Sequence, residues 1–224
     1  MNRKILQTAE RLCLHESPQN PEAAQIEIVT IWKTAELMSK QFEVMEILAN
    51  QRIAEHPPNS TIQPYRIFDK CVRVFNVLGQ TDRFKIKAAP GFTAETRAYD
   101  KTFPIIATVL IGNAEKYSVE ATEIRVYLKK DSATCTVDVT NLSKGQDPLT
   151  DEIFARGVRG RTEKDGSGNG LYVAQLVAHQ HGTRISVKSA PYNAETMIHT
   201  FSVSFGLTQD TRRRLTPRSE IHNI

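Results

Sequence analysis

The sequence has little of what marks secreted, membrane-spanning or metal-binding proteins. Its three cysteines, Cys13, Cys71 and Cys135, lie far apart, with no CxxC pair and no Cys/His cluster. This spacing predicts reduced, mostly buried thiols. No run of about eighteen apolar residues is present, and the N-terminal segment MNRKILQTAERLCLHESPQN lacks the apolar core of a signal peptide. We therefore expect a cytoplasmic protein without membrane insertion.

A strong excess of charge is also lacking. The chain carries 29 Lys and Arg against 25 Asp and Glu, a formal net charge of +4 at pH 7, and part of the excess lies in TRRRLTPRSE. Residues 209–224 are therefore interpreted as a solvated basic tail, and no nucleic-acid binding is predicted. With 224 residues, 40% of them hydrophobic, the chain is long enough to bury a substantial core.

The character of the sequence changes near residue 80. Before this point, apolar residues from Ile28 to Ala49 recur in alternating steps of three and four, typical of a helix that packs along its length on other helices. Prolines in AEHPPNSTIQP break the pattern, and a second helix is expected over residues 67–78. Residues 1–80 are thus predicted to form a helical hairpin that makes a homodimer as a four-helix bundle. The alternative is that the hairpin folds back on the second half of its own chain.

After this point, strand and helix patterns mix. RFKIKAAPG and AETRAYD resemble short strands, and period-two alternation in EIRVYLKK and ATCTVDVTN predicts a strand hairpin. TRISVKS and MIHTFSVSF predict two further strands. Helices are expected over residues 103–117 and over GLYVAQLVAHQHG, which ends at Gly182. Residues 81–208 are therefore predicted to form an α+β domain, a sheet with helices on one face.

One predicted helix ends in unexpected polar residues. In LIGNAEKYS, the apolar stripe through Ile106 and Leu110 meets an amide at Asn113, with Lys116 and Tyr117 one turn further on. Taken alone, Asn113 could equally be a buried amide whose hydrogen bonds are satisfied by the backbone.

A glycine-rich segment follows a long irregular stretch. Residues 142–167 show little periodicity and form a segment too long for a plain connector. Irregular segments of this length are typical of functional lids. Gly166, Gly168 and Gly170 then lead straight into a helix. Glycines there let the backbone approach a ligand, and the helix start offers N–H groups to an anion. A flexible helix cap would explain this segment alone equally well.

In combination and order, these segments resemble the ATP-binding domain of sensor histidine kinases, in the superfamily of gyrase, chaperone, histidine-kinase and mismatch-repair ATPases. The resemblance covers about residues 84–205 and rests on NAEKYS, VTN with Gly145 beyond it, GSGNGL and HGTRI. IFARGVRG also resembles the family's lid segment, with Phe154 in place. The resemblance implies a Bergerat-type α/β sandwich, ATP and Mg²⁺ as cofactors, and an N-terminal dimerisation hairpin.

The resemblance also implies roles for particular residues. Asn113 would be the ligand of the Mg²⁺ that bridges the nucleotide phosphates, a role that an amide oxygen can fill. Lys116 would face phosphate, Tyr117 the base or ribose, and Asn141 the adenine. The other positions implied to bind nucleotide lie in or beside the glycine segments, at Gly145, Gly166, Gly168, Gly170 and Leu171.

Departures from the family pattern lie at the same places. Val109 stands where the family has asparagine and related ATPases carry a glutamate, and valine cannot activate water. Asn141 replaces the aspartate that accepts a hydrogen bond from adenine, and Ser143 replaces a glycine, so adenine should bind more weakly, by about 1 kcal/mol. In SKQF, Lys40 and Gln41 replace the phosphoacceptor histidine and the general base.

The sequence therefore predicts an ATP- and Mg²⁺-binding, histidine-kinase-like protein of two-component signalling that lacks the standard phosphoacceptor. It would act as a pseudokinase or adaptor toward a response-regulator-type or other signalling partner, and no catalytic residue is assigned. One alternative is an active histidine or serine kinase that acts on a partner or on a nonstandard site, with His15 and His56 as candidate acceptors. Another is a non-catalytic interaction module with a vestigial pocket, against which the retained Asn113 and GSGNGL argue.

Overall fold

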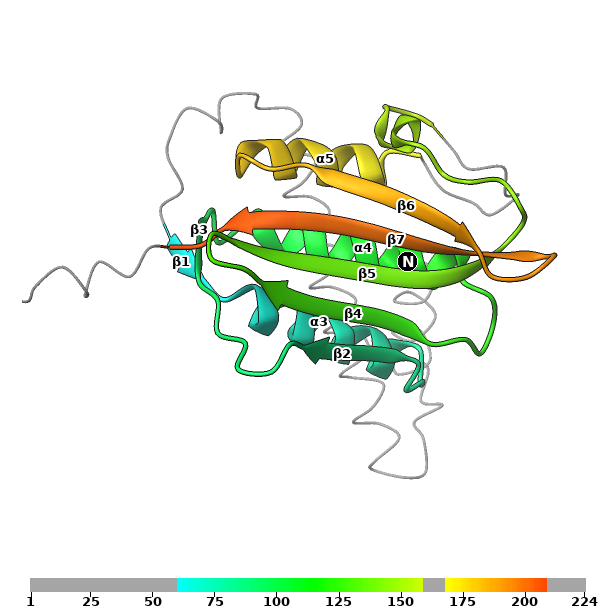
Figure 1. Cartoon of the computed structure of the whole chain (residues 1–224), viewed down its shortest axis with the longest axis horizontal. Helices are drawn as coiled ribbons and strands as arrows, with labels where there is room; N and C mark the ends of the chain where they lie inside the picture. Colours follow the sequence, from blue (N-terminus) through cyan, green and yellow to red (C-terminus); the bar gives the residue numbers. More distant parts are fainter. Residues whose placement is uncertain (1–59, 159–167, 209–224) are drawn as a thin grey trace, which may run out of the picture.

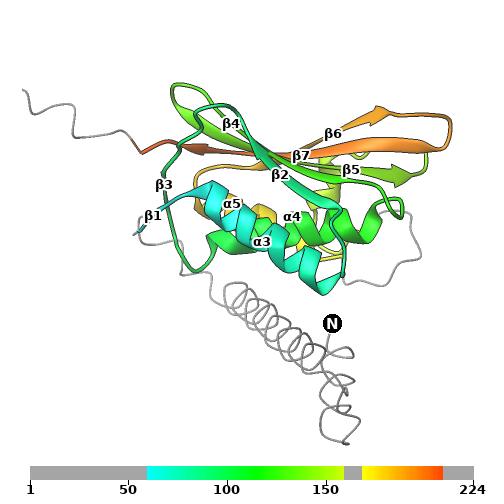
Figure 2. The ribbon, with the colours of Figure 1, turned by 90° about the horizontal axis from the view of Figure 1, so that it is seen from below.

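The structure is a computed structural model that describes residues 60–158 and 168–208. These residues confirm the predicted α+β architecture, because three helices cover one face of a five-stranded sheet (Figures 1 and 2). The helices are α3 (Pro64–Leu78), α4 (Phe103–Tyr117) and α5 (Gly170–Gln180). The strands of the sheet are β2 (Phe84–Ala88), β4 (Ile124–Lys130), β5 (Thr134–Lys144), β6 (Ile185–Pro191) and β7 (Thr196–Gly206).

The sheet has the order β2-β4-β5-β7-β6 and is mixed, since β2 runs parallel to β4 and the other neighbours are antiparallel. The predicted strand hairpin is confirmed as β4 and β5, with Val126 opposite Val139. Side chains on β5 alternate between the buried helix-facing side and the outer face. On that outer face Asp138 accepts hydrogen bonds from Ser202 (2.6 Å) and Lys129 (2.9 Å). The helices therefore lie on the apolar side.

Two short strands stand apart from the large sheet. β1 (Ser60–Ile62) pairs antiparallel with β3 (Thr96–Ala98). AETRAYD therefore contains a strand as expected, but this strand pairs with β1 instead of joining β2 and β4.

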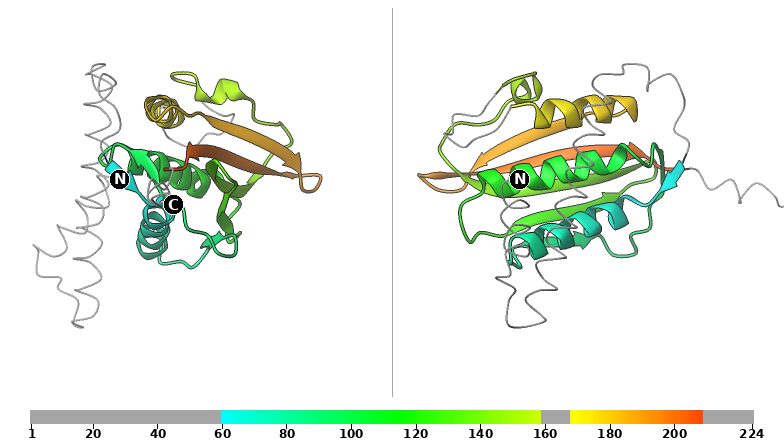
Figure 3. Two further views of the ribbon diagram at one scale, coloured as in Figure 1. Left: turned by 60° about the vertical axis from the view of Figure 1, so that its left-hand side comes forward. Right: turned by 180° about the vertical axis from the view of Figure 1, so that it is seen from behind.

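The central helix α4 is apolar over most of its circumference because it has neighbours on three sides. Ile106, Leu110 and Ile111 are fully buried, and the right-hand view of Figure 3 shows α4 between α3 and α5, in front of the sheet. Gly112 permits close packing here, since a Cβ atom at this position would lie 3.3 Å from the Phe75 ring of α3. A larger residue would require the Phe75 ring to shift.

The helix α3 lies within the segment predicted to form the N-terminal hairpin, residues 1–80. It packs against α4 and β2. Its side chains Phe68, Cys71, Val72 and Phe75 belong to the same hydrophobic core as the sheet. This helix therefore packs on the second half of the chain, while the first helix of the predicted hairpin lies outside the described residues.

The cysteine prediction holds for the two described thiols. Cys71 and Cys135 are buried and form no disulfide bond, and burial raises the pKa of the Cys135 thiol to about 11. Within residues 60–158 and 168–208, no helix is long and apolar enough to cross a membrane. The first predicted helix with Lys40 and Gln41, the residues Cys13, His15, His56 and Gly166, and the basic tail lie outside the described residues.

Candidate nucleotide site

The C-terminal end of α4 places three predicted site residues together. Asn113, Lys116 and Tyr117 are all half-buried, while Ala114 between them is buried against the core. The Lys116 Nζ lies 5.1 Å from the centre of the Tyr117 ring, within the range of a cation–π contact. Among the described residues, none hydrogen-bonds the Asn113 carboxamide. Asn113 is therefore not the backbone-satisfied amide considered above.

The end of α4 is tied to the end of β5. Ser118, the C-cap of α4, forms an isolated antiparallel bridge with Ser143 of β5. The backbone N–H of Val119 donates to the carbonyl oxygen of Leu142 at 2.7 Å. These contacts bring the segment NAEKYS beside VTNLSKG, two segments that the resemblance implied to share one site.

The side chain of Arg83 holds this junction from the β2 side. Its Nε donates to the carbonyl of Thr122 (3.0 Å), and its terminal nitrogen contacts the carbonyl of Val119 (3.2 Å) and the hydroxyl of Ser118. Three groups of the turn after α4 are therefore fixed by one guanidinium.

Asn141 lies on the helix-facing side of β5 and is only 3% exposed. No described residue hydrogen-bonds its side chain. Its carboxamide is not among the fully buried polar atoms without a partner, so these atoms can still be reached from outside. A reachable amide with no described partner fits a bound polar ligand, at the position where the resemblance implies the adenine.

The glycine segment reaches the site at the start of α5. A Cβ atom on Gly170 would lie 3.7 Å from Cγ1 of Val109, which stands one helical turn before Asn113. Within residues 60–158 and 168–208 no side chain caps α5 at this end, and the first N–H groups of a helix are available to a ligand or to water. Gly168 has a φ of +68°, a conformation that favours glycine.

Two of the predicted binding residues have structural roles of their own. Gly145 has a φ of +112°, and its N–H donates to the carbonyl of Glu195 at 2.9 Å. Leu171 is 7% exposed and packs in the hydrophobic core. The structure therefore does not direct the Gly145 N–H or the Leu171 side chain toward a ligand.

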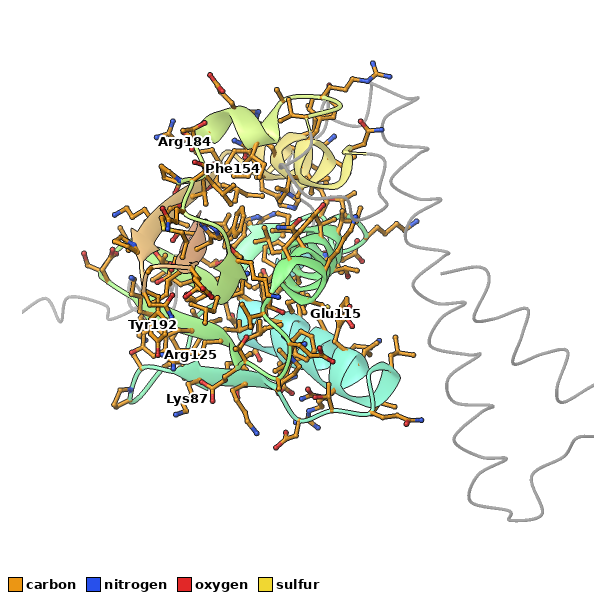
Figure 4. All side chains as sticks on the ribbon, turned by 90° about the vertical axis from the view of Figure 1, so that its right-hand side faces the viewer. Lys87, Glu115, Arg125, Phe154, Arg184 and Tyr192 are labelled. Carbon is orange, nitrogen blue, oxygen red and sulfur yellow. The ribbon has the colours of Figure 1, made fainter. Side chains whose placement is uncertain are left out.

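The lid segment is anchored where the resemblance placed its phenylalanine. Phe154, labelled in Figure 4, ends the short helix η2 (Asp151–Phe154) beside α5. Its side chain is buried and meets the ring of Phe201 edge-on, with the ring centres 6.3 Å apart. This contact fixes the beginning of the lid to β7.

His199 was not predicted to be part of the site. It lies opposite Asn141 in the register of β5 and β7. His199 is 5% exposed, its Nδ1 lies 2.8 Å from the Ser189 hydroxyl of β6, and that hydroxyl accepts from the N–H of Leu149. Burial lowers the pKa of His199. The period-two pattern of MIHTFSVSF could have shown it, because His199 shares a face with Phe201.

His181 has a structural role. Its Nδ1 donates to the carbonyl of Val177 (2.8 Å), and its Nε2 accepts from the N–H of Tyr99 (3.1 Å). Because both nitrogens are used and desolvation lowers its pKa, the ring stays neutral and joins α5 to the segment before α4.

One known family matches part of the chain. Residues 103–208 match the family described as histidine kinase-, DNA gyrase B-, and HSP90-like ATPase. Over these residues the chain is therefore similar to the ATPase domains of that family.

Two curated relatives align over 84 residues each. The sensor histidine kinase YvrG of Bacillus subtilis (strain 168) is 37% identical over 36% of this chain, and the probable sensor protein PcoS of Escherichia coli is 32% identical over 35%. The aligned segments span only 14% and 18% of those two proteins.

Solved structures share the fold. The mycobacterial sensor histidine kinase MprB superposes with a TM-score of 0.57 at 18% identity, over 66% of this chain and 98% of that one. Full-length ShkA, in complex with AMPPNP, gives 0.58 at 16% identity, over 92% of this chain and 43% of that one. Identities this low show the architecture alone.

Proposed function

We propose that the chain is an ATP- and Mg²⁺-binding, histidine-kinase-like signalling protein without the standard phosphoacceptor histidine, and that it acts as a pseudokinase or adaptor. The observation that carries the proposal is Asn141, a residue 3% exposed whose carboxamide has no hydrogen-bond partner among the described residues. The free carboxamide of Asn113 supports it from the neighbouring helix.

Different residues would contact different parts of the nucleotide. Asn141 would hold the base, and Tyr117 would lie against the base or ribose. Lys116 and the start of α5 would face the phosphates, where an ammonium group and helix N–H groups favour anions. Bound Mg²⁺ would neutralise phosphate charge, with Asn113 as its protein ligand. Within the described residues no group of three His, Cys, Asp or Glu could hold a metal, so the remaining ligands would be phosphate and water.

Nucleotide titration tests this proposal. ADP and an unhydrolysable ATP analogue are expected to bind the full chain with micromolar to millimolar affinity, and Mg²⁺ should strengthen binding of the analogue by about tenfold or more. Asn113→Ala should abolish the Mg²⁺ effect because it removes the oxygen ligand. Asn113→Asp keeps an oxygen and serves as the matched control, which should retain the effect. Calorimetry that shows no binding at millimolar nucleotide would refute the proposal.

We also propose that the chain forms a homodimer and serves a response-regulator-type or other signalling partner. The support is the three-four pattern from Ile28 to Ala49, because the apolar side chains of α3 already pack in the core with α4 and the sheet. Light scattering should give about twice 25.2 kDa. Met38→Glu with Phe42→Glu should return a monomer that still binds nucleotide, and a wild-type monomer at tens of micromolar would contradict the dimer.

A further inference from the structure

Three polar side chains form a row across the floor of the candidate site. Asn141 on β5 lies opposite His199 on β7, and His199 lies opposite Ser189 on β6. We call these three residues the polar row. The next inward-facing row consists of Val139, Phe201 and Val187. The polar row therefore interrupts an otherwise apolar floor.

Two groups of the polar row have no hydrogen-bond partner among the described residues. Asn141 has no side-chain hydrogen bond to any described residue, and the same is true of the Nε2 of His199, whose Nδ1 contacts Ser189. Both side chains are at least 95% buried. Neither the Asn141 carboxamide nor Nε2 of His199 is among the fully buried polar atoms without a partner. Both groups can therefore be reached by a ligand, and a ligand that supplies hydrogen bonds would be favoured there.

The chemistry of an amide differs from that of the carboxylate found in the family. A carboxylate only accepts hydrogen bonds, so it favours a base with an amino group and repels one with a carbonyl. An amide carries both an acceptor oxygen and a donor NH₂ group, and rotation by half a turn exchanges them. With no described partner to hold it in one orientation, the Asn141 amide can either accept or donate a hydrogen bond at the same position.

The Nε2 atom of His199 can likewise either donate or accept, depending on the tautomer of the ring. If the Ser189 hydroxyl donates to Nδ1, then Nε2 carries the proton and donates. If Nδ1 donates to Ser189, then Nε2 accepts. The hydroxyl oxygen can accept from Leu149 in both cases because it has two lone pairs.

We propose that this site does not discriminate between 6-amino and 6-oxo purine nucleotides. Asn141 would accept from the 6-amino group of adenine, or donate to the 6-oxo group of hypoxanthine or guanine, and His199 would adopt the matching tautomer. The inference rests on the proposed nucleotide-binding function and deepens it by naming the range of bases.

ADP and IDP are the sharpest pair of probes, because their bases differ only in the 6-position edge and IDP lacks the extra amino group of guanine. Calorimetry on the full chain with Mg²⁺ should give dissociation constants within about threefold of each other. Asn141→Asp should bind ADP at least about tenfold more tightly than IDP, because a carboxylate oxygen would then face the 6-oxo oxygen.

Thr140→Asp provides the matched control. Thr140 precedes Asn141 on β5 but faces the outer side of the sheet, where it contacts Thr200 (3.0 Å). This variant adds the same charge without reaching the base, so its ratio of ADP to IDP affinity should equal that of the wild type. Thermal melting checks that each variant is folded, and the wild-type ratio decides the matter even if a variant is not.

The outcomes are distinct. Wild-type binding of ADP more than about tenfold tighter than IDP overturns this inference and leaves the proposed function standing. An unchanged ratio in folded Asn141→Asp overturns it too, since the base is then not read by Asn141. Failure of both nucleotides to bind at millimolar concentration overturns the proposed function and this inference with it.

Discussion

Purified protein incubated with γ-labelled Mg-ATP is expected to gain no acid-labile phosphate and to hydrolyse ATP at no more than a trace rate. Hydrolysis needs a base for the attacking water. Val109 is aliphatic and packs toward Gly170 at the start of α5. Autophosphorylation needs a neutral nucleophile, but at the matching position the amine of Lys40 is protonated at neutral pH, and Gln41 cannot take a proton.

A revertant sharpens this test. Lys40→His together with Gln41→Glu restores the nucleophile and the base, and labelling of this double variant would show that the rest of the site is competent. The single change Gln41→Glu is its control and should remain unlabelled. Labelling of the wild type that disappears in His15→Ala or His56→Ala would show instead a working kinase with its acceptor elsewhere.

Phe68→Ala should lower the free energy of unfolding of the ATPase domain by about 3–5 kcal/mol. Phe68 is fully buried on α3, in one core with α4 and the sheet, so its removal leaves a cavity that rigid neighbours cannot fill. Amide hydrogen exchange of β5 and β7 measures the effect, because the inner strands of a sheet exchange through global opening. Their protection should fall by about a hundredfold or more.

The exposed Arg66 on the same helix supplies the control. Arg66→Ala should change the free energy of unfolding by less than about 0.5 kcal/mol. If protection of β5 and β7 is unaffected by Phe68→Ala, α3 unfolds independently of the sheet, and the boundary near residue 80 is the better description.

The strands of the sheet were predictable because apolar and polar residues alternate along a strand that has one buried and one exposed face. Alternation in ATCTVDVTN gave β5 together with its inward residues. The same reasoning failed for α3, since a three-four pattern shows that a helix has an apolar stripe but not what covers it. Phe68 and Phe75 could have met a second copy of the chain as well as α4.

The sequence predicts members of the candidate site but not the contacts that arrange them. Asn113, Lys116, Tyr117 and Asn141 come together through the bridge between Ser118 and Ser143, which no spacing in the sequence reveals. The backbone conformation of Gly145 and the burial of Leu171 depend on β7 and the core, both remote in sequence. His199 was missed because its partner Ser189 becomes a neighbour only through the pairing of β6 with β7.

The guanidinium of Arg83 has a consequence for affinity. By holding the turn after α4 at Ser118, Val119 and Thr122, it restricts that end of the helix during folding, before any ligand arrives. Immobilising loops and side chains on binding opposes association. A ligand at Asn113 therefore meets a preorganised surface, and little conformational entropy remains to be lost on this side of the site when it binds.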